Sequence, residues 1–468
     1  MYRNDSLFTQ LIDFLPKVLP LINPAIKDSY FPTTLNEYPV LKYQSNGFPG
    51  ISNYPSRVDI SNLFRPSYGN TPPKVNLEAS EGYLVMLEML MAMPEIIAYY
   101  STPNKKKDDD KWFAFACADI IENFVERYYY LHGDVFDLSK FVDIYIPFEN
   151  YIYAENLGFD ISVPILFVKF ETDFYQLVPG IKIRRISDEV QRGRYKIKSY
   201  SPAILESVMM SATHELVLEN YYYKKPLNYF QDPFGDAKIY PHMLIEQFFT
   251  TLKIATDITS GYAQILIHPI NWVGNYVSDI TSLLGTSVRN YPGFFDDYLW
   301  NKEEFQKVSD DQLEEVKSIF TGVYKSEKNQ INFALKRFYK STLRAEEEDI
   351  IVDLIIALEM LLSDSEKNEI THKLALRIST LLSKHLPEKY EPLAVFANVK
   401  KIYAYRSGIV HGNYKTKQIK EIKTADNTTV PIVNLANEYL REILSTVIHE
   451  PKYLEATVID KLLLTGSL

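Results

Sequence analysis

The sequence predicts an α+β fold in which a mixed helical and strand-containing N-terminal region precedes an all-helical antiparallel bundle. Through the last third of the chain, apolar residues recur every three or four positions, as in amphipathic helices. Between Asp134 and Arg185 they alternate with polar residues, as in half-buried strands. A hydrophobic content of 46% indicates a buried core, and 468 residues suffice for two or three domains. We expect units at residues 1–135, 136–305 and 306–468.

The composition narrows the class of protein. The single cysteine, Cys117, excludes an intrachain disulfide framework and a cysteine-rich metal site, so a reducing cytosol is the expected compartment. The N-terminus lacks the pattern of a secretory signal, and the most apolar window, Val85–Ile97, is too short and too interrupted to span a membrane. We therefore expect a cytoplasmic protein with no membrane partner. A net charge of −10 argues against a protein that coats nucleic acid over its whole surface, but it allows a local basic site.

The N-terminal region begins with a segment that is hard to interpret. Residues 1–75 are rich in Pro, Asn, Ser and Tyr and show no long periodic apolar face, and the stretch Ser45–Pro73 is expected to be irregular chain on a surface. Helices are predicted over Ala79–Tyr100 and Lys111–Leu131. The run Lys105–Asp110 between them, three lysines followed by three aspartates, is expected to form an exposed loop.

Strands are predicted next. Val142, Ile144 and Ile146 alternate with polar or aromatic residues, and the pattern repeats from Ile161 to Phe167. Pro179-Gly180 suits a type II turn that would join an antiparallel pair, and Ser187 followed by two acids predicts a helix N-cap. For residues 200–300 we expect mostly helices.

The bundle has the clearest signals. Ser309 and Gln312 form a capping box for a helix that should end at Gly322. Further amphipathic helices follow, marked by apolar residues in the ranges 331–338, 350–362, 374–382, 396–403 and 440–447. Their short connections imply antiparallel packing. The helix starting at Ile350 is apolar on a second face, so it is either central or faces a partner subunit.

Common catalytic signatures are absent from the sequence. There is no phosphate-binding glycine loop and no metal-ligand cluster, and His214-Glu215 lacks the second histidine of a zinc-binding helix. Other lone histidines, such as His242 and His268, are expected to be structural. We therefore expect no metal and no cofactor.

One constellation suits chemistry on a phosphodiester. Arg406 and His411 lie five positions apart beside two glycines. An imidazole can transfer protons to and from ribose and leaving oxygens near neutral pH, while a guanidinium stabilises extra charge on the phosphate oxygens. Seven basic residues and one acid lie between Lys400 and Lys423, which predicts an anion-attracting patch. The alternative is a solvated loop with a helix-ending histidine.

The Arg-x4-His spacing alone is weak, since Arg127 and His132 repeat it at the expected end of an earlier helix. Five residues of ideal helix turn about 500°, so Arg406 and His411 would point roughly 140° apart. Either Gly408 breaks the helix, or the site is shared between two copies across a two-fold axis. We therefore expect a homodimer, or a larger even-numbered oligomer, to be required for activity.

The bundle resembles the HEPN ribonucleases, and within them the Apea-like group of bacterial anti-phage defence. The resemblance spans roughly residues 325–450 and is carried by Asp353–Glu359, by Glu369 with Lys373–Arg377, and by Tyr405–Gly412. It implies metal-independent RNA cleavage by Arg406 and His411, leaving 2′,3′-cyclic phosphate and 5′-hydroxyl ends at a site between two protomers. It also implies an N-terminal region that senses infection, with a phage-derived activator.

The predicted site therefore combines a catalytic pair with supporting and RNA-binding residues. The catalytic pair is Arg406 and His411; the supporting residues are Ser407, Asn413 and Glu359; the RNA-binding residues are Lys400, Lys401, Lys415 and Lys417. For Glu359 and Arg377 we favour a charged pair in the bundle interior that orients helices. The predicted function is a defence endoribonuclease and toxin that cleaves host RNA, with transfer RNA as the expected target. The alternative is a non-catalytic HEPN module that binds nucleotides or assembles with protein partners.

Overall fold

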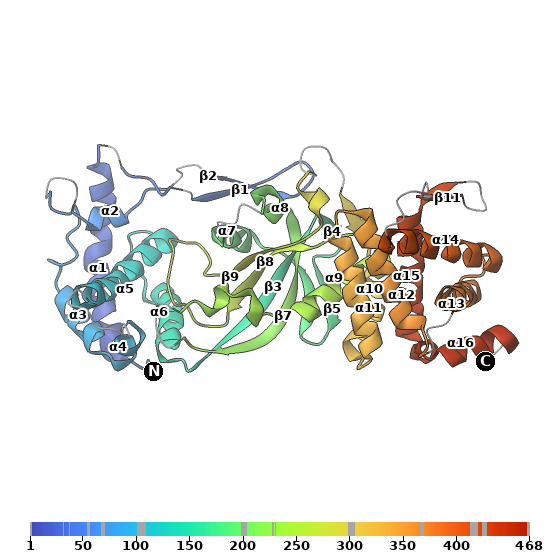
Figure 1. The fold of residues 1–468 in the computed structure, drawn as a ribbon. Helices are drawn as coiled ribbons and strands as arrows, with labels where there is room; N and C mark the ends of the chain where they lie inside the picture. The colour runs from blue at the N-terminus through green and yellow to red at the C-terminus, as the bar shows by residue number, and fades with distance from the viewer. Residues whose placement is uncertain are drawn as a thin grey trace.

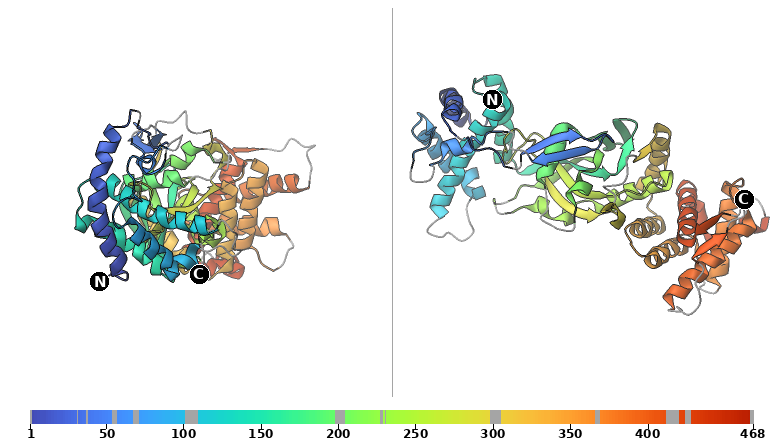
Figure 2. Two further views of the ribbon diagram at one scale, coloured as in Figure 1. Left: turned by 90° about the vertical axis from the view of Figure 1, so that its left-hand side faces the viewer. Right: turned by 90° about the horizontal axis from the view of Figure 1, so that it is seen from above.

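The computed structural model shows an elongated α+β molecule with its termini at opposite ends (Figure 1). N-terminal helices, a central sheet and a C-terminal helical part follow one another along the long axis, and the view from above shows the same order (Figure 2). The structure describes residues 2–30, 32–36, 38–53, 57–66, 71–100, 109–197, 204–226, 229, 231–297, 305–365, 369–411, 420–423 and 428–465. The α+β class predicted from the sequence is confirmed.

The N-terminal part begins with a 23-residue helix that buries one apolar face, so the interpretation that residues 1–75 lack a long periodic apolar face is wrong. Helix α1 (Asp5–Lys27) contains Pro16, Pro20 and Pro24. Their four-residue spacing places all three prolines on the exposed face, while the opposite face is buried. The prolines conceal the helical pattern because they normally break a helix interior. The segment continues with a hairpin and a short helix: β1 (Pro39–Tyr43), β2 (Pro49–Asn53) and α2 (Ser61–Phe64).

The helix predicted over Ala79–Tyr100 is two helices, α3 (Tyr83–Ala92) and α4 (Pro94–Tyr100), bent by 74°. Met93 adopts an extended conformation at the break, which the following proline favours. The helix predicted over Lys111–Leu131 is confirmed as α5 (Asp109–His132), while Lys105–Asp108 of the predicted loop lie outside the described residues. None of the described helices, taken singly, is long and apolar enough to cross a membrane; only the bent pair α3–α4, taken together, reaches that composition.

The strand predicted around Val142–Ile146 is wrong, because these residues lie in helix α6 (Leu138–Tyr153). The short alternation sits within a longer helical pattern in which Phe141, Ile144, Tyr145 and Phe148 are buried. Asp137 caps this helix by accepting a hydrogen bond from the backbone N–H of Ser139. Three-residue alternation is therefore too short a signal to distinguish strand from helix here.

A six-stranded antiparallel sheet forms the centre of the molecule, in the order β5-β6-β7-β3-β8-β9. The strand predicted from Ile161 lies in β3, and the predicted hairpin is confirmed, with Gly180 at φ 79° in its turn. The expectation of mostly helices over residues 200–300 is wrong, because three sheet strands lie there. The sheet strands are β3 (Asn156–Leu166), β5 (Phe174–Val178), β6 (Ile181–Arg185), β7 (Ala212–Lys224), β8 (Tyr262–Pro269) and β9 (Leu284–Asn290).

Helices cover both faces of this sheet. Helix α7 (Asp188–Lys196), capped by Ser187 as predicted, and α8 (Glu206–Met210) pack on one face. Helix α9 (His242–Thr256) packs on the other. Two short strands, β4 (Val168–Phe170) and β10 (Gln306–Val308), pair in parallel and lead the chain into the helical part.

The C-terminal part is a helical bundle with one small hairpin, as expected. The predicted capping box of Ser309 and Gln312 is present, but the helix runs on past Gly322. Gly322 is needed for packing, because a Cβ there would lie 2.6 Å from Cγ2 of Ile448. The elements are α10 (Asp310–Lys325), α11 (Asn329–Thr342), α12 (Glu347–Leu362), α13 (Ile370–His385), α14 (Pro392–Val410), β11 (Glu421–Lys423), β12 (Thr429–Pro431), α15 (Ile432–His449) and α16 (Ala456–Thr465).

Two large apolar cores meet at α9 and α10. The first joins the N-terminal helices to the sheet and includes Phe248 of α9 and Phe320 of α10. The second fills the bundle and includes Ile254 of α9 and Ile319 of α10. Each of these helices therefore contributes one face to each core.

Candidate functional site

Helix α14 carries the Arg-x4-His constellation on its last turn. Glu391 begins the helix by accepting hydrogen bonds from the backbone N–H groups of Leu393 and Ala394, and Pro392 occupies the first turn. The helix continues through Gly408 to Val410, so the option that Gly408 breaks it is wrong. His411 is the C-terminal cap residue, and its backbone N–H donates to the carbonyl of Ser407 at 3.0 Å.

Arg406 is half-buried and is held by an aromatic neighbour. Its guanidinium carbon lies 5.8 Å from the ring centre of Tyr403, one helical turn earlier. Its Nε is buried and donates no hydrogen bond to a protein group among the described residues. The rest of the guanidinium is thus the part available to an anionic ligand.

Tyr403 is itself fixed by Glu359 of α12. Its hydroxyl donates to the Glu359 carboxylate, and burial together with this hydrogen bond raises the pKa of Tyr403 to about 12. Tyr403 therefore stays neutral and keeps donating at physiological pH. Glu359 therefore acts on Arg406 indirectly, by positioning the Tyr403 ring against which the guanidinium lies.

The expected charged pair between Glu359 and Arg377 is wrong. Arg377 is 3% exposed and donates instead to Asp364, to Asp460 and to the carbonyl of Leu362, all at 2.7–2.8 Å. These contacts join α13 to α16 and to the end of α12. Arg377 therefore has a structural role, because its hydrogen bonds hold helices together and do not involve Arg406.

His411 is exposed at the end of α14. Because the helix is continuous, Arg406 and His411 project about 140° apart around its axis. No hydrogen bond links the two side chains within the described part of this chain. The structure thus places both residues at the C-terminal end of one helix, about 1.4 turns apart, but does not bring their functional groups together in a single subunit.

One face of α14 is open to solvent and leads to His411. From Lys400 to His411, eleven residues turn about 1100°, which is about 20° more than three full turns. Ser407, seven residues after Lys400, lies about 20° to the other side of Lys400 around the axis. Lys400 and Lys401 are exposed, Ser407 is half-buried, and the Lys400 ammonium lies 5.4 Å from the ring centre of Phe396. This face combines two lysines, a hydroxyl and the imidazole, all of which can contact an anionic ligand.

The predicted basic patch is weaker than its sequence suggests. Lys420 forms ion pairs with Glu347 and Glu348 in the first turn of α12, at 3.3 and 3.7 Å. Its charge is therefore partly neutralised. The predicted residues Asn413, Lys415 and Lys417 lie outside the described residues.

The second Arg-x4-His match has a structural role. The Arg127 guanidinium donates to the carbonyls of Ser278 and Ile280 at 2.8 and 2.9 Å and lies against the Tyr276 ring. His132 is the last residue of α5, as expected for a helix terminus.

The other histidines that the sequence analysis considered also form hydrogen bonds within the protein. His214 is buried in β7; its ring contacts the Thr213 hydroxyl and the Thr172 carbonyl, and burial lowers its pKa to about 4. His242 contacts the carbonyl of Ala237 at 2.6 Å. His268 lies 2.7 Å from the hydroxyl of Ser162.

Sequence reasoning missed Tyr403 as part of the site and treated it as core. An aromatic residue one turn before an arginine on the same helix is the signal that identifies it. Across the described residues, no group of three or more His, Cys, Asp or Glu side chains is arranged to hold a metal ion. The comparisons with protein-family models, with curated proteins and with solved structures give no match to this chain.

Proposed function

We propose that this protein is a metal-independent endoribonuclease of the HEPN type, related to the Apea-like group. The observation that carries the proposal is the last turn of α14, where an exposed imidazole follows an arginine that is braced by Tyr403 and Glu359. The surrounding antiparallel helices and the motifs at Asp353–Glu359 and Tyr405–Gly412 support it.

The reaction follows from the two groups. One imidazole removes the proton from a ribose 2′-hydroxyl, whose oxygen attacks the adjacent phosphorus. The bond from phosphorus to the 5′-oxygen breaks, and that oxygen takes up a proton. The Arg406 guanidinium stabilises the charge on the phosphate oxygens in the transition state. The products are a 2′,3′-cyclic phosphate and a 5′-hydroxyl end.

The site requires two subunits in this proposal. The roughly 140° separation on an unbroken helix keeps Arg406 and His411 of one chain from gripping the same phosphate. The open face of α14 also exposes apolar side chains, with Leu393 76% and Val410 50% exposed. A two-fold interface formed around the C-terminal end of α14, where Val410 is exposed between Arg406 and His411, would place the arginine of one subunit beside the histidine of the other.

The proposed biological role is abortive infection: the nuclease cleaves host RNA, with transfer RNA as the substrate to test first, when a phage-derived activator engages the N-terminal part. The competing function is a non-catalytic HEPN module that binds nucleotides or assembles with proteins. The neutralised Lys420 and the net charge of −10 favour that alternative.

Cleavage of RNA by the purified protein in EDTA tests the proposal. We expect product ends that carry a cyclic phosphate, and a loss of roughly 10²- to 10⁴-fold in rate for His411→Ala and for Arg406→Ala. His372→Ala, which removes another exposed histidine of the bundle, is the matched control and should cleave normally. Cleavage that requires added divalent metal, or that survives both site substitutions, would refute the proposal and favour the binding module.

A further inference from the structure

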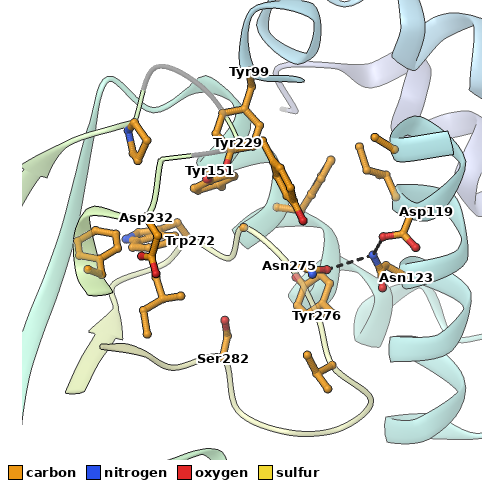
Figure 3. Close-up of a pocket in the computed structure, with 18 of the residues that line it drawn as sticks. Tyr99, Asp119, Asn123, Tyr151, Tyr229, Asp232, Trp272, Asn275, Tyr276 and Ser282 are labelled. Carbon is orange, nitrogen blue, oxygen red and sulfur yellow. Dashed lines mark hydrogen bonds between the residues drawn. The ribbon is translucent and has the colours of Figure 1, made fainter. Parts of the chain in front are cut away.

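A cavity of about 410 Å³ lies at the other end of the molecule, between the N-terminal helices and the sheet (Figure 3). Helices α4, α5 and α6 form one side, and Pro226, Tyr229 and residues 231–234, together with the loop at residues 272–284, form the other. The volume falls in the range typical of small-molecule sites. Nothing in the proposed nuclease chemistry uses this cavity.

Its walls are strongly aromatic. Two of the protein's three tryptophans, Trp112 and Trp272, line it. Trp272 stacks on Tyr151 with ring centres 5.5 Å apart, and Tyr100 stacks on Tyr229 at 5.3 Å. Tyr229, half exposed, lies toward the opening. Flat aromatic surfaces of this kind suit a planar ring that stacks.

The opposite wall offers a polar edge (Figure 3). The Asn123 amide nitrogen donates to Asp119 and to the Asn275 amide oxygen, each at 3.1 Å. The Asn123 oxygen and the Asn275 nitrogen are then left without a hydrogen-bond partner among the described residues. An acceptor and a donor side by side match the hydrogen-bonding edge of a nucleobase.

Charge argues for a neutral ligand. The Lys225 ammonium already lies over the rings of Tyr151 and Tyr99, at 4.7 and 5.4 Å, and Arg127 lies over Tyr276. Rings engaged by protein cations attract a second cation poorly. A phosphorylated ligand is also disfavoured. Lys196 is the one cationic side chain among the described lining residues, and the carboxylates of Asp119 and Asp232 in the same lining would repel a phosphate.

We propose that this cavity binds a nucleoside or free nucleobase, stacked on the aromatic wall and read by the Asn123–Asn275 edge. The site is independent of the nuclease proposal. It lies where the N-terminal helices contact the sheet, so an occupant would bridge these two parts of the chain.

Titration calorimetry of the full chain tests this inference, with quenching of tryptophan fluorescence as a second readout. The probes are adenosine, guanosine, cytidine and uridine, their 5′-monophosphates, and choline. We expect at least one nucleoside to bind, its monophosphate to bind more weakly, and choline not to bind. Asn275→Asp keeps the side-chain shape but exchanges the donor for an acceptor, and it should weaken nucleoside binding roughly tenfold.

The control is Asn332→Asp in α11, far from the cavity. The aspartate keeps the side-chain oxygen that accepts a hydrogen bond from Gln247 of α9. It should bind the nucleoside as the unchanged protein does. Because Asn275 is exposed, its substitution should leave the melting temperature unaltered. The proposal is overturned by any of three results: no nucleoside binding up to about 5 mM, affinity unchanged in Asn275→Asp, or choline binding more tightly than every nucleoside.

Discussion

Mixing two inactive variants would show whether the nuclease site is shared between subunits. The Arg406→Ala subunit keeps His411, and the His411→Ala subunit keeps Arg406. On the continuous helix α14 these two residues of one chain diverge by about 140°, so each proposed Arg–His pair joins different subunits. Neither variant alone can form a complete pair, whereas the mixed dimer forms one.

The expected magnitude follows from the symmetry. An isologous dimer contains two equivalent cross-subunit pairs, and the mixed dimer retains one of them. Random reassociation of equal amounts makes about half of the dimers mixed. The isolated mixed dimer should therefore recover about half of the normal rate, and an unfractionated mixture about a quarter, against a loss of roughly 10²- to 10⁴-fold for each variant alone.

The assay is RNA cleavage in EDTA after co-expression of the two variants with different affinity tags. Capture on both tags in succession isolates the mixed dimer and proves that it forms. A matched preparation combines Arg406→Ala with the double variant Arg406→Ala/His411→Ala, which has no complete pair. Equal activity in the two preparations would refute the shared site and require Arg406 and His411 of one chain to act together.

Three predictions concern stability in urea. Since burial lowers the pKa of His214 to about 4, the unfolded chain binds more protons between pH 4 and 6.5; stability should fall by about 3 kcal/mol on acidification through that window, less in His214→Gln. Arg377→Met leaves the Leu362 carbonyl without its donor and should cost about 3 kcal/mol, against at most about 1 for Lys17→Met at an exposed pair with Glu81. Gly322→Ala crowds Ile448 and should cost about 1 kcal/mol, whereas Gly293→Ala should cost nothing. Equal costs for a variant and its control, or a pH-independent stability, would contradict these assignments.

The elements predicted correctly are those whose local and tertiary preferences agree. The capping box at Ser309, the Pro179-Gly180 turn and the amphipathic helices of the bundle are specified by neighbouring residues. Helix α1 escaped prediction because its three prolines lie on the exposed face, which is a property of the folded helix. Strand β8 escaped it because the short apolar run Ile265-Leu266-Ile267 does not distinguish a buried strand from a buried helix, and β7 and β9 escaped it because neither shows a regular alternation of apolar and polar residues.

The candidate site was predictable in its chemistry but not in its supports. The spacing of Arg406 and His411 is visible in the chain, whereas the contact from Glu359 through Tyr403 links two helices 44 positions apart. The aromatic cavity lies further beyond sequence reasoning, since its lining residues come from six separated segments. Partial neutralisation of Lys420 by Glu347 likewise depends on how α12 packs.

Helices α9 and α10 each belong to both apolar cores, and this has a practical consequence for dissecting the protein. A fragment that starts at residue 306 would lack α9, leaving the face of α10 that contains Phe320 without its covering layer. Such a fragment should precipitate or stick to chaperones. Because strands β8 and β9 of the central sheet follow α9 in the chain, a single cut cannot keep α9 with the bundle and leave the sheet whole.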